Sequence, residues 1–536
     1  MIALAGFLDV LLRGFGLLGL AAALGGIAFA AVVLHGGGAP RPAWDRTLGW
    51  AATGGALLAV CQALRLVLQP WALADDLGRW PLAAYLATGV ARCGMIQVLL
   101  AAGLALALIR LKNHPRRAAA WLTAGLLAVA LLVNGAWLVH GASRLEDRGL
   151  LMTLTVLHQL GAAVWVGGVL HLLNLRRLAG DGPLWPQSLA RFSPLAAAAV
   201  ALLLAAGLAL AWHYVGGWGE LIGTGYGAMV LTKALLLAIS LGLAAGNFWA
   251  VRRWRHSGDG AAVNLRTPAF VEVELGVLAI VMLTAASLTS LPPAVDVGRQ
   301  ATAAEVAAVF APRPPRLEPP PQEAFLAAAT SVLDSYALPP AIEKAHNEYN
   351  HHMAGLLLLA MGLLALLEYS GRAAWARHWP LLFFGLAAFL FVKAEPTVWP
   401  LGPESFWATL QVPAVLQHRL ATLLVVGLGL FEWQVRAGRL AGSRWGYVFP
   451  LLCAVGGAML LTHSHVAFEL KAEFLIEVSH AALGFLAVVM GAGRWLELRL
   501  PAPGRRRAAP GRRRAGLAWR AALVLMGLVL VFYREI

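Results

Sequence analysis

Long apolar runs recur along the whole chain and are separated by short polar segments. A helix of about 20 apolar residues spans the hydrocarbon core of a bilayer. Fourteen runs of this kind lie near residues 8–34, 47–69, 87–109, 118–140, 150–174, 194–215, 227–250, 268–291, 350–368, 379–394, 414–433, 446–463, 473–496 and 517–533. The pattern predicts an all-α fold, a polytopic helical membrane protein with about 14 transmembrane helices in two bundles.

A proline-rich segment, residues 292–349, separates the two expected bundles. It contains LPPAVDVG near its start and APRPPRLEPPPQEAF further on. Proline removes a backbone donor and fixes an extended conformation, so this segment is expected to be a linker on the outer side. The prediction is an eight-span module over residues 1–291 and a six-span module over residues 350–536, which includes an arginine-rich inner loop at 499–516.

The distribution of lysine and arginine predicts the orientation. With the N-terminus outside, the inner loops hold most of the basic residues, including Arg505–Arg507 and Arg512–Arg514. This asymmetry is the one that membrane topology requires. The net charge of +15 therefore reflects topology, and the expected partner is the lipid bilayer and not a nucleic acid.

The first module contains two similar segments. Residues 18–26 read LGLAAALGG and residues 160–168 read LGAAVWVGG, while Thr88-Gly89 and Thr224-Gly225 open the third and seventh spans. Two parallel four-helix repeats would explain the similarity. Chance similarity among helices rich in small residues explains it equally well, because such residues let helices approach closely.

The most unusual stretch is Thr462–His480, a polar segment between two apolar runs. On a helix, Glu469, Glu473, Glu477 and His480 fall within a stripe about 80° wide. Carboxylates and imidazoles that lead into a membrane helix are costly unless they face a cavity, a partner or a metal. The stretch is therefore expected to take part in a site on the outer side.

Histidines from four helix ends of the second module are expected at the same membrane depth. His351 and His352 are adjacent, so on a helix they point about 100° apart and do not easily face one site. We predict a metal site at this depth, with unrelated interfacial histidines as the alternative. The candidate metal ligands are His346, His351, His352, His418, His463, His465, Glu477 and His480, together with His158 inside the fifth span.

The residue types leave the metal open. Imidazole suits copper, zinc, iron and nickel, whereas nearby thioethers such as Met353 and Met459 favour Cu(I). Two ExxH patterns, ending at His346 and His480, are each half of a di-iron bundle site. Paired histidines on facing helices also suit a b-type haem. The three cysteines form no CxxC pair, so a thiolate metal motif is not expected.

Four segments between Met152 and Pro293 carry a family resemblance. They are LHQLGAAVWVGGVLHL at 157–172, FSPLAAAAVALLLAAGLAL at 192–210, LIGTGYGAMVLTKALLLAISLGLAAGN at 221–247 and FVEVELGVLAIVMLTAASLTSLPPA at 270–294. In this order they resemble the copper resistance D (CopD/PcoD) family of bacterial inner-membrane proteins. His158, Trp165, Lys233 and Glu274 stand at family-like positions.

The resemblance implies copper handling between periplasm and cytoplasm. We expect a non-enzymatic, multi-pass protein of the bacterial inner (plasma) membrane with a periplasmic N-terminus, which takes copper up and meets a periplasmic copper chaperone. No Walker motif occurs, so an ATP-driven pump is not expected. The alternative is a redox or cuproenzyme-assembly protein that holds haem or copper without transporting it. A metal-binding sensor or chaperone scaffold is a third hypothesis.

Overall fold

The computed structural model describes residues 2–35, 38–180, 182–258, 260–329, 331, 341–462, 471–501 and 509–535. Within these residues the regular structure is helical, and fourteen helices are long and apolar enough to cross a membrane. The predicted all-helical, multi-span fold is therefore confirmed. Large apolar side chains such as Leu99, Leu208 and Leu423 are exposed on the spans, as lipid-facing helices require.

The N-terminal bundle contains eight spans. They are α1 (Ile2–Phe29, continued by a π-helical turn at Ala30–Leu34), α2 (Arg41–Leu77), α4 (Gly89–Asn113), α5 (Ala118–Ala136), α6 (Arg148–Ala179), α7 (Leu184–Val215), α9 (Gly225–Ser257) and α10 (Gly260–Leu288). The short helices α3 (Leu82–Leu86) and α8 (Trp218–Gly223) precede α4 and α9. Thr88 and Thr224 cap α4 and α9 by accepting a hydrogen bond from a backbone N–H.

The C-terminal bundle contains six spans. They are α13 (Ala341–Tyr369), η5 with α14 (Ala374–Leu381 and Leu382–Lys393), α16 (Pro413–Arg436), η6 with α17 (Arg444–Tyr447 and Val448–Leu461), α18 (Lys471–Arg499) and α19 (Ala509–Val531). The α13 helix begins at Ala341 rather than near residue 350, because the polar stretch AIEKAHNEYN is already helical. The short tenth span begins as a 3-10 helix, which is tighter and rises further per residue.

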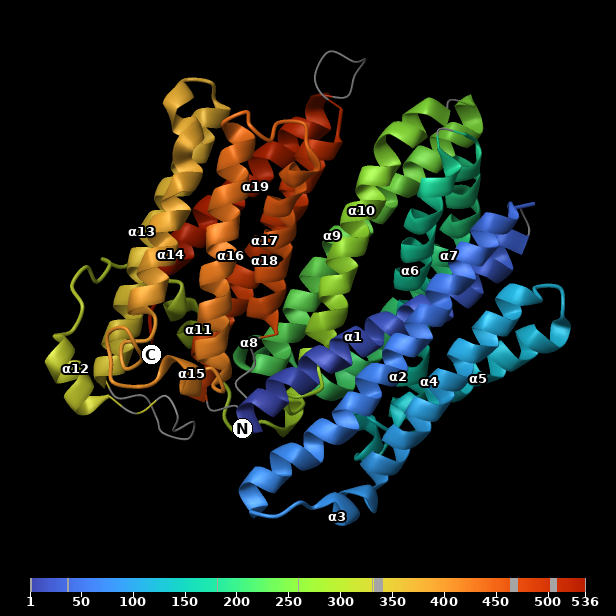
Figure 1. Ribbon diagram of the computed structural model, residues 1–536, viewed down its shortest axis with the longest axis horizontal. Helices are drawn as coiled ribbons and strands as arrows, with labels where there is room; N and C mark the ends of the chain where they lie inside the picture. The colour runs from blue at the N-terminus through green and yellow to red at the C-terminus, as the bar shows by residue number, and fades with distance from the viewer. Residues whose placement is uncertain are drawn as a thin grey trace.

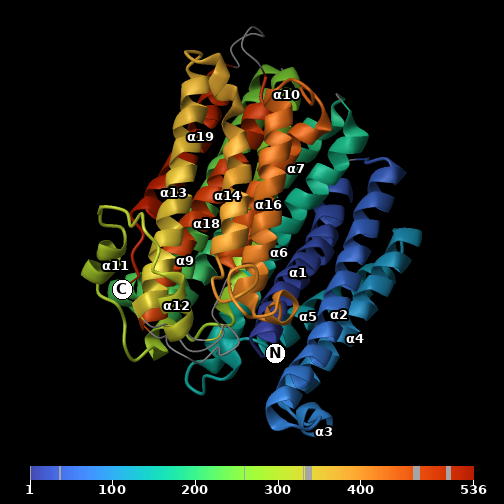
Figure 2. The ribbon, with the colours of Figure 1, turned by 60° about the vertical axis from the view of Figure 1, so that its left-hand side comes forward.

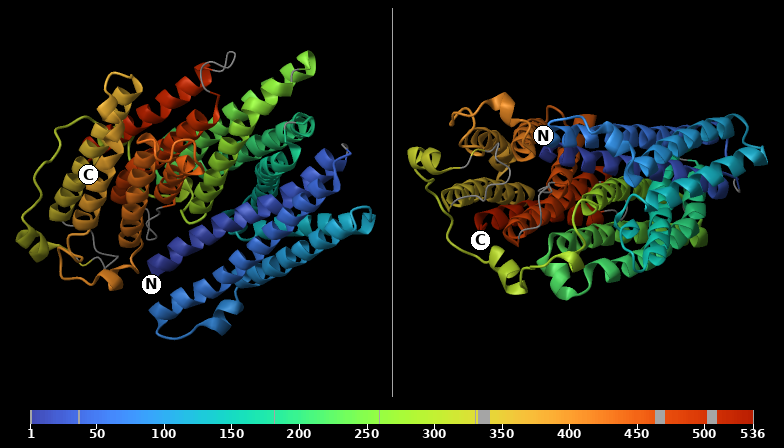
Figure 3. Two further views of the ribbon diagram at one scale, coloured as in Figure 1. Left: turned by 45° about the horizontal axis from the view of Figure 1, so that its top comes forward. Right: turned by 90° about the horizontal axis from the view of Figure 1, so that it is seen from below.

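The long helices of both bundles run between the same two ends of the molecule (Figures 1 and 2). One end, here called the terminal face, carries both chain termini and the short helices α3, α8, α11 (Ala303–Val309), α12 (Gln322–Ala328) and α15 (Phe406–Thr409). The described part of the segment that joins the bundles passes across this face from α10 to α12 (Figure 3). The opposite end carries the arginine-rich loops and is called the basic face.

The two bundles meet where α9 and α10 pack against α18. Near the basic face, Glu272 of α10 accepts hydrogen bonds from Trp495 Nε1 at 2.8 Å and from the Arg499 guanidinium at 2.5 and 2.7 Å. Near the terminal face, Lys471 pairs with Glu305 of α11 at 2.6 Å. One end of α18 is thus tied to α10 of the N-terminal bundle and the other to α11 of the joining segment.

Close glycine contacts hold the N-terminal bundle together. Gly25 of α1 faces Gly167 of α6, and a Cβ added at either position would collide with the other backbone. These two glycines occupy equivalent places in the similar segments 18–26 and 160–168. Equivalent residues that meet across an interface are what a pseudo-two-fold axis between two repeats would produce. The duplication itself stays a prediction.

Candidate metal centre

A cavity of about 290 Å³ lies inside the C-terminal bundle. Its imidazoles are His351 of α13, His418 of α16 and His480 of α18, three of the predicted ligands. The remaining lining is mostly apolar. Four sulfur-containing side chains also line the cavity: Cys453, Met459, Met490 and Met526. The structure therefore brings histidines from three helices to one space that also offers soft ligands.

His351 and His480 are neighbours in this cavity. Their ring centroids are 5.9 Å apart, with the ring planes at 82°. A metal about 2.0–2.1 Å from one nitrogen of each ring holds the two centroids roughly 6 Å apart. The observed separation therefore fits one ion shared by the two rings. The other face of His351 stacks on Tyr533, with a centroid distance of 3.9 Å.

Hydrogen bonds fix the tautomer of both rings. His351 Nδ1 lies 2.7 Å from the carbonyl oxygen of Asn347, and His480 Nδ1 lies 3.1 Å from that of Ile476, one turn earlier on each helix. A carbonyl oxygen only accepts, so Nδ1 carries the proton in each ring and Nε2 keeps its lone pair. This is the arrangement of a metal-ligating histidine whose second nitrogen is held by the backbone.

His418 is held by a carboxylate. Its Nδ1 lies 2.5 Å from Oε1 of Glu395, just after the end of α14. Carboxylate–histidine pairs orient imidazoles at metal sites and increase their basicity. The pairing of Glu395 with a histidine 23 residues away depends on how α14 and α16 pack.

His346 and His352 do not line the cavity. His346 Nε2 lies 3.1 Å from the Lys393 carbonyl oxygen, and its ring contacts Phe325 of α12 at 4.9 Å. Both nitrogens of His352 are engaged, Nδ1 with the Arg316 N–H at 2.7 Å and Nε2 with the Tyr533 carbonyl oxygen at 2.8 Å. As expected for adjacent helical residues, His351 and His352 face different surroundings. These contacts fasten the linker and the C-terminal segment to α13.

Two predicted ligands, His463 and His465, lie outside the described residues. Glu477 of α18 is half-buried but is not one of the residues that line the cavity. Among the residues that the structure describes, no three His, Cys, Asp or Glu side chains form a metal-binding group. Thioethers, including that of Met459, line the same cavity as His351 and His480 and are a ligand type that suits Cu(I).

A buried ionic network lies beside the cavity on its basic-face side. Fully buried Glu432 contacts Arg436 at 2.7 Å and Arg494 at 3.0 Å. Glu497 contacts Arg494 at 2.7 Å and Arg520 at 2.9 Å. The sequence treated Arg436 as a loop residue and missed this network. The signal was present, because glutamates and arginines recur near the inner ends of three apolar runs.

In the N-terminal bundle, His158 is separate from the other predicted ligands. Its Nδ1 lies 3.0 Å from the Leu203 carbonyl oxygen on α7. The family-like residues Trp165 and Glu274 instead contact each other, with Trp165 Nε1 donating to Glu274 Oε1 at 3.0 Å. Asn247 Nδ2 donates to Glu274 Oε2 at 3.1 Å. The sequence named Trp165 and Glu274 but gave no sign that they meet.

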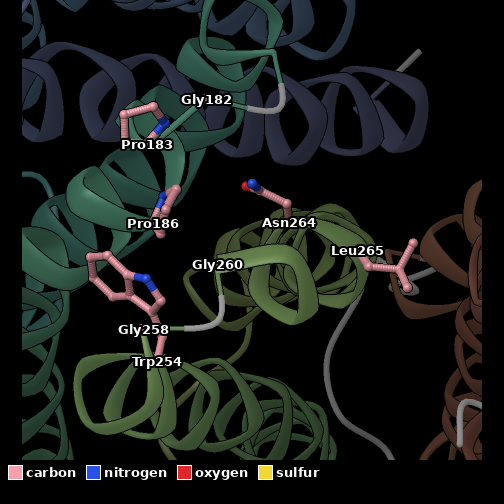
Figure 4. A pocket seen from close by; sticks show the side chains of 8 residues that line it. All are labelled: Gly182, Pro183, Pro186, Trp254, Gly258, Gly260, Asn264 and Leu265. Atoms are coloured by element: carbon pink, nitrogen blue, oxygen red, sulfur yellow. The ribbon is translucent and has the colours of Figure 1, made fainter. Parts of the chain in front are cut away.

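A pocket of about 570 Å³ lies at the basic face between α7, α9 and α10 (Figure 4). Its lining residues are Gly182, Pro183, Pro186, Trp254, Gly258, Gly260, Asn264 and Leu265. The described lining offers copper no imidazole, thiol, thioether or carboxylate. The cavity in the C-terminal bundle is therefore the better candidate metal centre.

Residues 186–288 match the family model of copper resistance protein D. Over 175 residues the chain is 30% identical to a Bacillus subtilis (strain 168) protein named "Copper transport protein CutJ". That alignment covers 32% of this chain and 31% of the relative, so it spans about a third of each protein. No solved structure matches the chain. The matched domain contains all of α9 and α10 and most of α7.

Proposed function

Since the chain carries a copper resistance D domain, we propose that the protein moves copper across a bacterial inner membrane, from the periplasm to the cytoplasm. The observation that carries the proposal is the combination of this domain with a second bundle whose cavity presents three imidazoles and several sulfur ligands. Copper is the cargo of this protein.

The basic loops support an N-terminus in the periplasm. The positive-inside rule assigns the basic face to the cytoplasm, and the terminal face then lies in the periplasm. His351, His418 and His480 lie toward the terminal-face ends of their helices. They are thus on the side from which a periplasmic chaperone would deliver copper.

The cavity supports a capture role for His351 and His480. Their Nε2 lone pairs are preorganised by backbone hydrogen bonds, which lowers the cost of arranging ligands at binding. His418, held by Glu395, supplies a third imidazole on another helix. The rest of the lining is mostly apolar and includes four sulfur-containing side chains, an environment that favours Cu(I) over hard cations.

A transport assay in proteoliposomes tests the proposal. The full chain should accumulate copper inside liposomes, and the double variant His351→Ala/His480→Ala should lose that accumulation. His256→Ala is the matched control, because this histidine is exposed near the basic face. Uptake by the double variant at the control rate would overturn the capture role, and no uptake by the unaltered protein would overturn the transport function.

The size of the cavity supports a second candidate function, a membrane redox or cuproenzyme-assembly protein that holds haem or copper in place. Histidines on facing helices around a large apolar space suit a b-type haem. An absorption spectrum of the purified protein decides between the two. A Soret band that disappears in His351→Ala and His480→Ala variants would favour the redox protein, and bound copper without a Soret band would favour copper handling.

A further inference from the structure

Glu274 lies at the middle of a membrane span. It is fourteen residues from each end of α10, Gly260 and Leu288, which corresponds to about 21 Å at 1.5 Å per residue. Only 3% of its surface is exposed. It belongs to the copper resistance D domain at 186–288. A carboxyl group at this depth is expensive to retain and is a functional candidate by default.

The structure records no cation against this carboxyl group. Its recorded side-chain partners are Trp165 on α6 and Asn247 on α9, which are both uncharged. Glu272, two residues away, points to the other bundle, where it binds Trp495 and Arg499. The helices packed against α10 carry further titratable groups. They are Asp9 and Arg13 on α1, Arg148, His158, His171, Arg176 and Arg177 on α6, Arg191, His213 and Tyr214 on α7, Tyr226, Lys233 and the Arg252–His256 segment on α9, Cys453 on α17, and Lys471, Glu477, His480, Arg494 and Glu497 on α18.

These groups are engaged elsewhere or lie at other depths. Arg13 binds Asp9 at 2.5 Å, and His171 Nε2 lies 2.8 Å from the Ala22 carbonyl oxygen. On α9, Lys233 lies fourteen residues from Asn247, about 21 Å along the helix. Without a cation, an ionised carboxylate at the membrane centre would be strongly disfavoured, whereas a neutral carboxylic acid would not.

The surroundings of Glu274 suit both protonation states. The ionised form accepts from Trp165 Nε1 and Asn247 Nδ2, as the structure shows. The protonated form has an O–H to donate, and Asn247 Oδ1 is a buried acceptor without a hydrogen-bond partner. Rotation of the Asn247 amide by half a turn presents that oxygen to Glu274. A single side-chain movement thus satisfies the acid in either form.

Polar groups continue from this position toward the terminal face. Ser240 lies seven residues before Asn247 on α9, two turns along the same face, and is fully buried. Its Oγ also lacks a hydrogen-bond partner. Buried water molecules commonly bind polar groups that have no hydrogen-bond partner in the protein, and here two such groups lie on one face of α9. Water at Ser240 and Asn247 would link Glu274 to the terminal half of the membrane.

We propose that Glu274 is a proton-binding site that couples copper uptake to proton entry. A proton from the terminal face converts the Glu274 carboxylate to the acid, and release toward the basic face restores the carboxylate. One proton moves with each transport cycle and no redox step is involved. This coupling rests on the proposed copper transport, whereas the protonation of Glu274 does not.

Infrared spectroscopy of the purified full-length protein tests the protonation alone. We expect a carboxylic-acid C=O band near neutral pH that is absent in Glu274→Gln and disappears on alkalinisation. Trp165→Phe should shift this band, because it removes the hydrogen bond to Oε1. The absence of any Glu274-dependent acid band from acidic to neutral pH would overturn the proposal.

Copper uptake in proteoliposomes tests the coupling. An acidic exterior should accelerate copper uptake by the unaltered protein. It should not change uptake by Glu274→Gln, so the ratio of that variant's uptake rates with and without the pH gradient should be one. Glu220→Gln, which alters a half-buried carboxylate of α8 in the same domain, should keep the full response. A gradient response in Glu274→Gln would overturn the coupling and leave copper transport standing. No copper uptake by the unaltered protein, with a titrating acid band, would overturn both transport and coupling and keep the proton site.

Discussion

Two regions of the molecule, the helices around Glu274 and the helices around the C-terminal cavity, treat buried space and buried acids differently. The N-terminal bundle closes α1 against α6 through backbone contact at Gly25 and Gly167, and it buries Glu274 without a recorded cation. The C-terminal bundle keeps a cavity of about 290 Å³ and compensates its buried acids, such as Glu432 and Glu497, with arginines. The difference indicates an acid without a recorded countercharge at the centre of the N-terminal bundle, and a cavity lined by histidines and sulfur atoms inside the C-terminal bundle.

The largest expected effect comes from filling the glycine contact. Gly167→Leu places a side chain where the backbone of Ala21 lies. Helix backbone, unlike the end of a flexible side chain, does not shift easily to relieve such a collision. We expect a loss of at least about 3 kcal/mol of stability and a collapse of the yield of monodisperse protein in detergent. Gly276→Leu, which meets open space, is the control. Equal yields for the two variants would contradict the close packing of α1 on α6.

The next effect comes from breaking the ionic network. Glu432→Gln leaves Arg436 and Arg494 with less compensating charge in a buried site. Removing one partner of a buried ion pair costs about 3–5 kcal/mol, which thermal unfolding in detergent will register. Asp296→Asn, in a more exposed pair with Arg144, should cost at most about 1 kcal/mol. Similar losses in both variants would mean that the network is solvated.

The smallest expected effect is a pH dependence of protein stability that arises at the C-terminal segment. In this segment Tyr533 stacks on the ring of His351. Burial raises the pKa of Glu535 from its usual range to about 7. The folded state then favours the protonated acid. The resulting contribution to the stability of the folded state is fully present below about pH 4.5, and it is lost as pH rises through 7. We expect the melting temperature to fall between about pH 5 and 8, by an amount that corresponds to about 1–3 kcal/mol.

Glu535→Gln should make the fall in melting temperature over this range smaller than in the unaltered protein. A profile of the unaltered protein that already has no slope there would show that the segment does not bury the carboxyl group in solution.

Apolar run length was enough to predict fourteen spans, because crossing a bilayer requires about 20 apolar residues whatever their partners. Apolar run length placed the start of α13 near residue 350. The helix begins at Ala341, because the polar residues at the terminal face are also helical. The expected span 414–433 also ended before Arg436, because a charged residue ends an apolar run even when Glu432 on the same helix and Glu368 on α13 compensate its charge.

The candidate site was only partly predictable for a related reason. The angular separation of His351 and His352 follows from helix geometry alone, so the sequence indicated that they would face different surroundings. The rotation of α13 against α18 and α19 decides which of these two histidines lines the cavity. Likewise, Trp165 and Glu274 meet across 109 residues of chain, and no local pattern encodes that contact.

Copper bound to the purified full-length protein tests the central claim most directly. Metal analysis with X-ray absorption at the copper edge should find copper bound by imidazole nitrogen and thioether sulfur. The His351→Ala/His480→Ala variant should lose this copper, while His256→Ala keeps it. Undiminished copper in the double variant, or no copper in the unaltered protein after loading with Cu(I), would contradict a copper site in the C-terminal bundle.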